Sequence, residues 1–202
     1  MKTMPETNFQ QLAHTLPEEL IGERIVLRPY RPGDGAALWE AIESSRKYLR
    51  LWLPWVDKTQ TPEDAEESAR RMAARWLLRE DLPVGIWQKG TNQLLGGSGL
   101  HRIDWTIPKF EIGYWLRKSA EGQGFMTEAV RLLCRMVFDD LRANRVEIRC
   151  DTRNIRSAAI PRRLGFLHEA TLRHNSRDNS GELYDTYIFS LLPAEFKRDE
   201  MR

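Results

Sequence analysis

A glycine-rich turn leads directly into an amphipathic helix in the middle of this chain, and a predicted strand lies on either side of that unit. The turn and helix start read EGQGFMTEA (residues 121–129), and the strands read EIGYWL (111–116) and RVEIRCD (145–151). Backbone N–H groups at a helix start have no intrahelical partner, and the helix dipole adds partial positive charge there. Glycines let a phosphate approach this backbone closely, so the order of elements predicts a cleft with a pyrophosphate site.

Other phosphate-binding signatures are absent from the sequence. The chain has no GxxxxGK[ST] motif for nucleoside triphosphates, and Thr127 stands where the dinucleotide motif GxGxxG requires its last glycine. A second GxG pair, Gly97 and Gly99, has no helix after it, so such a pair alone is weak evidence. The alternative interpretation of Gly122 and Gly124 is a plain loop-to-helix cap.

A second polar helix start follows the strand at 145–151. The segment CDTRNIRSAAIPRRLGF (150–166) carries Asn154 and Ser157, and either residue type is typical of a helix N-cap. Capping alone accounts for both residues. A catalytic or cofactor role for the pair is a further hypothesis that their spacing does not prove.

The remaining pattern predicts an α+β protein with a mixed sheet in the order β-α-α-β-β-β-α-β-α-β-β. Helices are predicted to begin after Asp34 and after Thr61, and over residues 124–141 and 155–163. The predicted strands lie at 24–30, 84–89, 94–104, 111–116, 145–151, 168–172 and 183–191. We expect a polar leader at 1–20, a single domain at 21–195 and a polar tail at 196–202.

The composition excludes several classes of protein. With 41% apolar and 30% charged residues in a chain of 202, the sequence is typical of a globular protein rather than a disordered one. Its 31 basic and 29 acidic residues are interspersed, whereas a nucleic-acid-binding protein is expected to show a clustered basic surface. We therefore expect no direct nucleic-acid partner.

Cysteine usage and the N-terminal segment indicate a cytoplasmic protein. Cys134 and Cys150 form no CxxC pair, and no histidine lies at metal-ligand spacing, so we expect two reduced thiols and no metal site. The first residues lack the apolar core of a secretory signal. No apolar run approaches the ~20 residues that cross a bilayer, so we expect no membrane segment.

Taken together, EIGYWL, EGQGFMTEA and CDTRNIRS…RRLGF resemble the motifs of the GNAT superfamily of acetyltransferases. Within it they are similar to the RimJ/RimL-like branch, which acetylates the N-termini of ribosomal proteins. The resemblance covers residues 20–192. It implies a splayed, mostly antiparallel mixed sheet flanked by helices, with acetyl-CoA as cosubstrate and no metal.

The resemblance also implies roles for individual residues. Acetyl-CoA would lie between the strand that ends near Leu116 and the strand at 145–151. Asn154 would hydrogen-bond the pantetheine arm, and Ser157 would lie near the sulfur. The backbone of the loop and helix start would hold the pyrophosphate, through Gly122, Gln123, Gly124, Phe125, Met126 and Thr127.

The chain departs from the family pattern at three positions. The usual Gln/Arg-x-x-Gly-x-Gly/Ala reads Glu121-x-x-Gly124-x-Met126, and the Glu121 side chain is expected to point away from a pyrophosphate. Many members carry a tyrosine seven residues after the asparagine as the acid for the leaving thiolate, but this chain has Pro161. The resemblance therefore leaves Ser157 as the candidate acid. Pro161 is also expected to end or kink its helix early.

The sequence also offers candidates for a general base and for the pocket that binds the acceptor amine. An α-amine with a pKa near ~8 is about a tenth neutral at pH 7, so a carboxylate acting through a water suffices. Glu111 is the candidate base, although an exposed strand acid explains it equally well; His101 and His174 are alternatives. A backbone N–H near Leu116 is the candidate donor to the thioester oxygen. Four aromatic residues could line the acceptor pocket or simply pack: Trp52, Trp55, Tyr184 and Tyr187.

The leading prediction is direct transfer of acetyl from acetyl-CoA to the N-terminal α-amine of a protein or peptide, such as a ribosomal protein. One alternative is the same chemistry on a small amine, such as an antibiotic, a toxin or a metabolite. Another is a non-catalytic acyl-CoA-binding sensor. A homodimer is expected only by default, because most soluble oligomers are symmetric homo-oligomers.

Overall fold

The computed structural model describes residue 12 and residues 15–196. The strands are β1 Leu20–Ile21, β2 Ile25–Pro29, β3 Leu82–Gln88, β4 Leu94–Asp104, β5 Lys109–Leu116, β6 Arg145–Asp151, β7 Leu167–Arg177 and β8 Leu183–Leu191. The α-helices are α1 Gly35–Glu43, α2 Arg46–Leu49, α3 Pro62–Leu78, α4 Phe125–Arg135 and α5 Ile155–Arg163. Short 3-10 turns occupy Pro54–Lys58 and Lys118–Ala120, and a π turn, Met136–Asp140, follows α4.

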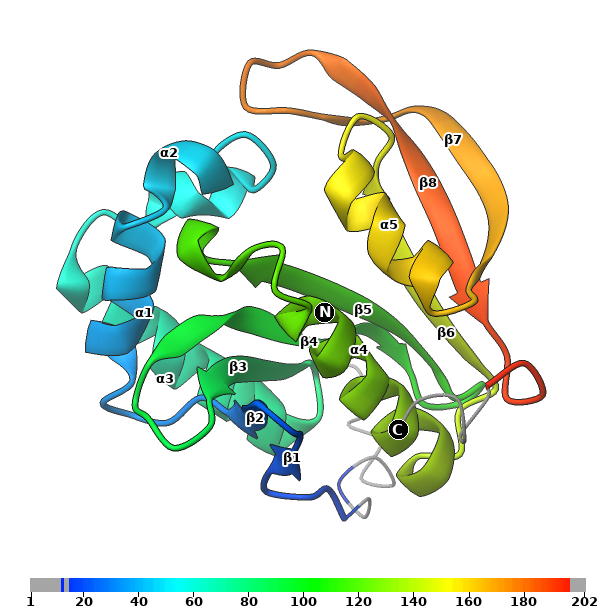
Figure 1. Ribbon diagram of the computed structural model, residues 1–202, viewed down its shortest axis with the longest axis horizontal. Coiled ribbons are helices and arrows are strands. Elements are labelled where there is room, and N and C mark those ends of the chain that lie inside the picture. Colours follow the sequence, from blue (N-terminus) through cyan, green and yellow to red (C-terminus); the bar gives the residue numbers. More distant parts are fainter. Residues whose placement is uncertain (1–11, 13–14, 197–202) are drawn as a thin grey trace, which may run out of the picture.

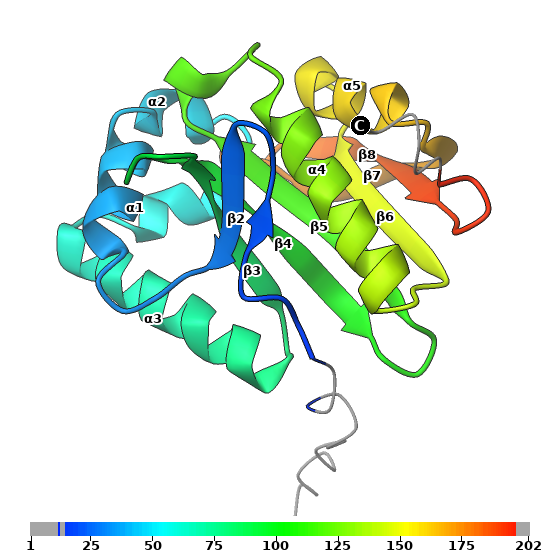
Figure 2. The same ribbon diagram turned by 60° about the horizontal axis from the view of Figure 1, so that its bottom comes forward.

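The strands form one sheet with helices on both of its faces. Their order is β1-β2-β3-β4-β5-β6-β8-β7. Figures 1 and 2 show α4 and α5 on one face of this sheet and α1 and α3 against the other. Of the paired strands in the described ranges, β5 and β6 run parallel and the others antiparallel. The predicted α+β fold with a mixed, mostly antiparallel sheet is therefore confirmed.

The apolar periodicity of the sequence explains how both faces are covered. Phe110 and Ile112 of β5 are buried in the same cluster as Val130 and Leu133 of α4. Trp115, which has the opposite parity on β5, packs instead with the cluster formed by α1 and α3. Strand alternation thus sends neighbouring residues of β5 into two separate cores.

Capping residues fix where two of the helices begin. α3 begins after Thr61, as predicted, and a capping box forms there: the Thr61 hydroxyl accepts from the Asp64 N–H at 3.1 Å, and the Asp64 carboxylate accepts from the Thr61 N–H at 2.9 Å. Asp34 precedes α1 as predicted, but its carboxylate does not cap the helix. It accepts from the Arg28 guanidinium at 2.7 and 2.9 Å instead, which ties β2 to the start of α1.

Several element boundaries differ from the predicted ones. β1 was not predicted, because a strand of two residues carries no pattern. The segment 48–56, where no helix or strand is predicted, begins within α2 and ends within the 3-10 turn that starts at Pro54. The helix predicted over 124–141 is α-helical to Arg135 and continues as a π turn. β7 extends to Arg177, beyond the predicted end at 172.

The predicted leader and tail fall largely on residues 1–11, 13–14 and 197–202, which lie outside the described residues. The proposed domain limits therefore stay a prediction. Within the described ranges, no helix is long and apolar enough to cross a membrane. Cys134 and Cys150 are both free thiols, as predicted, and both are buried.

Candidate active site

A cleft opens where β5 and β6 separate. The two strands pair from Lys109 and Arg145 to Glu111 and Glu147, and their described pairing ends there. A cavity of about 1300 Å³ lies beyond this point, bordered by residues of α2, β5, the loop before α4, α4, β6 and α5. The divergence leaves the last residues of β5 without a strand partner on the side that faces β6.

Leu116 presents a backbone N–H to this opening. The Arg117 N–H donates to the Leu95 oxygen of β4 at 2.8 Å. Because successive residues of a strand direct their N–H groups to opposite edges, the N–H groups of Leu116 and Tyr114 are directed to the side of the cleft. This is the position that the sequence predicted for a donor to a thioester oxygen.

The loop before α4 has the conformation of an anion site. Gly122 and Gly124 have φ angles of +73° and +84°, which residues with a Cβ rarely adopt. Gly124 occupies the N-cap position and has no side chain to cap the first N–H groups of α4. The Arg24 guanidinium holds the loop by donating to the Gln123 oxygen at 2.7 Å and to the Glu128 carboxylate at 3.0 Å. The helix start therefore offers backbone donors to an anion.

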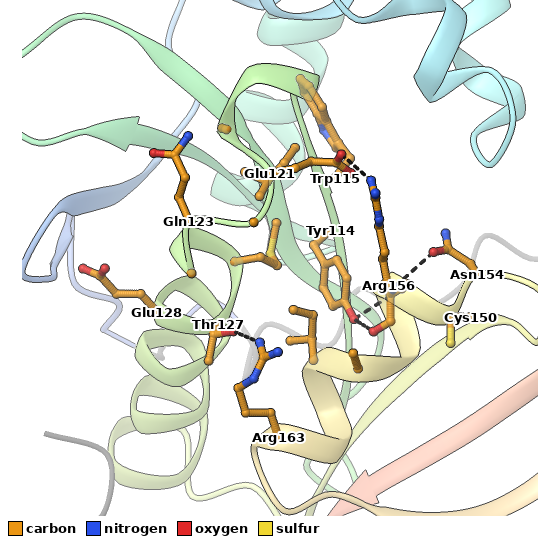
Figure 3. A pocket seen from close by; sticks show the side chains of 18 of the residues that line it. Tyr114, Trp115, Glu121, Gln123, Thr127, Glu128, Cys150, Asn154, Arg156 and Arg163 are labelled. Carbon is orange, nitrogen blue, oxygen red and sulfur yellow. Dashed lines mark hydrogen bonds and ion pairs between the residues drawn. The ribbon is translucent and has the colours of Figure 1, made fainter.

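Most of the predicted cofactor residues line the cleft, namely Leu116, Gly122, Gln123, Gly124, Met126, Thr127, Asn154 and Ser157. Phe125 differs, because its side chain is buried in the core below the Arg24 guanidinium and leaves only its backbone for a ligand. The Thr127 hydroxyl accepts from Arg163 at 3.0 Å, which links α4 to α5 (Figure 3). The structure thus brings the two predicted helix starts to one cavity.

Asn154 caps α5, as the sequence predicts. Its side-chain oxygen accepts from the Ser157 N–H at 3.0 Å. The Ser157 hydroxyl lies 3.4 Å from the Tyr114 hydroxyl oxygen. Cys150 also lines the cleft, and burial raises the pKa of its thiol to about 11, so it is protonated at neutral pH. The Ser157 side chain is half-buried beside these groups.

α5 runs from Ile155 to Arg163, as predicted, so Pro161 lies inside the helix and does not end it. That Pro161 kinks the helix stays a prediction. A proline inside a helix has no N–H for the carbonyl four residues earlier, which here belongs to Ser157. The Tyr114 hydroxyl donates to that carbonyl at 2.9 Å. A side chain from β5 thus supplies a donor at the point where the proline removes one.

Glu121 lies in the wall of the cleft and joins three elements. Its carboxylate accepts hydrogen bonds from the Tyr48 hydroxyl, from Lys118 at 2.6 Å and from Arg156 at 2.7 Å. Burial raises the pKa of Glu121, but these donors outweigh burial and hold the pKa below its usual value. Burial, together with Glu121, raises the pKa of Tyr48 to about 12. That the carboxylate points away from a pyrophosphate stays a prediction.

The candidate base Glu111 lies where the strands separate, and it is not among the described residues that line the cleft. Its carboxylate is 3.2 Å from the Arg149 guanidinium, which does line the cleft, and 3.3 Å from that of Arg102. Burial raises the pKa of Glu111 above its usual value, although both guanidinium groups lower it. His101 and His174, the alternative bases, also lie outside the lining.

Aromatic side chains line the part of the cleft that is formed by α2, β5 and β8. They include Tyr48, Trp52, Trp115 and Tyr184. Trp55 instead packs edge-on against Trp115, with 5.8 Å between ring centroids. Sequence reasoning missed Tyr48, because its place in the site depends on a contact with the distant loop before α4.

Comparison with known proteins identifies the family. Residues 24–167 match the family described as acetyltransferase (GNAT) domain. The chain belongs to the GNAT acetyltransferase family. As a GNAT enzyme it transfers the acetyl group of acetyl-CoA to an amine.

Similar proteins match about three quarters or more of the chain. YdaF of Bacillus subtilis (strain 168), provisionally named a ribosomal N-acetyltransferase, is 32% identical over 184 residues, which are 89% of this chain and 97% of YdaF. The ribosomal-protein-serine acetyltransferase of Escherichia coli (strain K12) is 24% identical over 153 residues, 76% of this chain and 84% of that protein. The solved structure of RimL, a ribosomal L7/L12 alpha-N-protein acetyltransferase, in complex with coenzyme A has a TM-score of 0.81 at 21% identity and covers 87% of this chain and 98% of its own. This last likeness shows the fold.

The cleft fits the cosubstrate of the GNAT family. Acetyl-CoA carries a pyrophosphate, and the uncapped start of α4 provides backbone donors for such a group. GNAT enzymes use acetyl-CoA without a metal ion. Within the part of the chain that the structure describes, no group of three or more His, Cys, Asp or Glu residues could hold one.

Proposed function

We propose that this GNAT enzyme acetylates the N-terminal α-amine of a protein, with ribosomal proteins as the acceptor class. The observation that carries the proposal is the similarity to YdaF over almost the full length of both chains. The more distant ribosomal-protein-serine acetyltransferase of Escherichia coli supports the same acceptor class. The aromatic wall of the cleft suits a peptide terminus, because Trp and Tyr give large, rigid contact areas to an extended chain.

In this proposal, different residues of the cleft bind different parts of acetyl-CoA. The backbone N–H groups of residues 122–127 bind the pyrophosphate of acetyl-CoA. Asn154, at the start of α5, hydrogen-bonds the pantetheine arm. The Leu116 N–H faces the thioester oxygen and stabilises the negative charge that develops there. Ser157, one turn into α5, lies beside the sulfur.

The reaction needs one proton donor and one proton acceptor. The amine nitrogen attacks the thioester carbon, so that a C–N bond forms and the C–S bond breaks. The Ser157 hydroxyl donates its proton to the leaving thiolate and is reprotonated from solvent. The proton of the new ammonium group leaves through a water to the Glu111 carboxylate, since Glu111 does not itself line the cleft.

An assay of CoA-thiol release tests the acceptor class. The wild-type enzyme is offered acetyl-CoA with peptides that begin with Ser, Ala or Met, and with a panel of small amines. We expect turnover on peptides. Turnover on small amines alone would refute the protein acceptor, and binding of acetyl-CoA without any turnover would favour the acyl-CoA sensor.

A substitution at Ser157 tests the proton donor separately. Ser157→Ala should lower kcat by about 10²-fold, at the lower end of the range for general acid catalysis. Binding of acetyl-CoA, followed by calorimetry, should stay nearly unchanged, because the substitution leaves the backbone N–H groups of residues 122–127 and the Asn154 side chain in place. An unchanged kcat would exclude Ser157 as the donor.

A further inference from the structure

Tyr114 reaches the first turn of α5 from β5. Ile112 and Leu116, which share its parity on β5, belong to or pack against the core that contains α4. Because β5 and β6 are no longer paired at this level, the Tyr114 side chain extends to α5 (Figure 3). Its hydroxyl oxygen is 2.9 Å from the Ser157 carbonyl oxygen and 3.4 Å from the Ser157 hydroxyl oxygen.

Pro161 explains why this carbonyl needs a donor from outside the helix. In an uninterrupted α-helix the N–H of residue 161 would donate to the Ser157 oxygen. Proline has no N–H, and α5 nevertheless continues past it. The Tyr114 hydroxyl occupies the role of the missing donor. Pro161 stands where the family usually has its tyrosine acid, and the carbonyl that Pro161 leaves without a donor is bonded by a different tyrosine, Tyr114.

Ser157 is consequently held through its backbone on both sides. The Asn154 side chain accepts from its N–H at 3.0 Å, and the Tyr114 hydroxyl donates to its oxygen at 2.9 Å. Burial raises the pKa of Tyr114 above its usual value, so the phenol keeps its proton at neutral pH and remains a donor. Two side chains from different elements thus define where the first turn of α5 lies.

We propose that Tyr114 is a positioning residue for Ser157. By replacing the helix hydrogen bond that Pro161 cannot make, Tyr114 fixes the first turn of α5 and aims the Ser157 hydroxyl at the reacting thioester. The inference rests on the proposed role of Ser157 as proton donor. It requires no contact between Tyr114 and either substrate.

A stability cycle tests the hydrogen bond without any acceptor. Tyr114→Phe keeps the ring and its packing but removes the hydroxyl, and should lower Tm by about 2–4 °C, the shift expected for one net hydrogen bond in a chain of this size. Pro161→Ala restores an N–H for the Ser157 oxygen. In the P161A background the Tm loss caused by Y114F should therefore be much smaller. Equal Tm losses in both backgrounds would overturn the proposal.

A kinetic cycle tests the positioning of the hydroxyl. Y114F should lower kcat roughly 10- to 100-fold, the range for misplacing a reacting group by about 1 Å, and should leave acetyl-CoA affinity unchanged. In the S157A background, Y114F should cause no further loss, because the group that it positions is absent. An equal loss with and without the Ser157 hydroxyl, or no loss at all, would overturn the proposal.

A matched control separates this effect from the removal of any phenol. Tyr187 packs against His168, with 4.9 Å between ring centroids, and does not line the cleft. Tyr187→Phe should leave both Tm and kcat unchanged. If the wild-type enzyme acetylates no acceptor, the proposed function fails, and the stability cycle then decides about Tyr114: coupling to Pro161 supports the bond, and its absence refutes it.

Discussion

Replacing Gly122 with alanine should weaken acetyl-CoA binding more than it weakens the fold. Gly122 has a φ of +73°, where a Cβ costs about 1–2 kcal/mol. An added Cβ meets no atom within 4 Å, so no clash adds to this cost. Gly122 lines the cleft, and the added methyl takes space that a phosphate needs to reach the backbone. Loss of one charge-assisted hydrogen bond, about 1.5–3 kcal/mol, raises the dissociation constant of acetyl-CoA about 10- to 150-fold.

Gly181 provides the matched control for this prediction. It has a φ of +88°, its Cβ would also meet no atom within 4 Å, and it does not line the cleft. Gly181→Ala and Gly122→Ala should therefore lower the free energy of unfolding equally in urea titrations. Only Gly122→Ala should weaken acetyl-CoA binding in calorimetry. Equal affinity of the two variants would refute the assignment of the pyrophosphate to this loop.

Three further substitutions test individual charges. Glu40→Gln removes the negative charge that accepts from the buried Arg117 guanidinium at 2.6 and 2.7 Å. Because Glu40 is more than half exposed, the free energy of unfolding should fall by only about 1–2 kcal/mol in urea, and an unchanged midpoint would contradict this. Hydrogen bonds from Arg145 lower the pKa of Glu169 from 4.5 to about 2. Glu169→Gln should therefore be less stable than the wild type above pH 4.5, and this difference in unfolding free energy should disappear as the pH falls to about 2. Unfolding measured at several pH values checks this. Burial raises the pKa of Glu111 above 4.5, because the folded state disfavours the charged carboxylate. As the pH rises from 4.5 through the raised pKa, the free energy of unfolding of the wild type should therefore fall relative to that of Glu111→Gln. Parallel profiles of unfolding free energy against pH would argue against a raised pKa.

Local sequence signals were sufficient to predict the elements around the cleft. Alternation in β5 and β6, the glycine turn and the apolar stripe of the following helix predicted the strand–loop–helix unit that the structure shows. Thr61 marked the start of α3 in the same way. These signals work because capping, backbone conformation and side-chain alternation depend on residues close in sequence.

Contacts between distant segments were not predictable from the same signals. Tyr114 lies within the predicted strand 111–116, but its contact with Ser157 is made between elements that are distant in sequence. The rule that proline ends a helix assumes that no outside donor serves the freed carbonyl, and here Tyr114 does. Glu111 was chosen as the base from its strand alone, and only the structure shows that it lies outside the cleft lining.

The separation of β5 from β6 also leaves a length of strand edge inside the molecule. An edge with free N–H and C=O groups on the outside of a protein invites pairing with another chain, and natural proteins guard against this with charges, prolines or bulges. Here the unpaired edge of β5 is protected by its position, since helices α4 and α5 border the opening between β5 and β6. The unpaired residues of β5 therefore face a cleft between two helices and not the outer surface of the sheet, which keeps this edge from acting as a template for pairing between proteins.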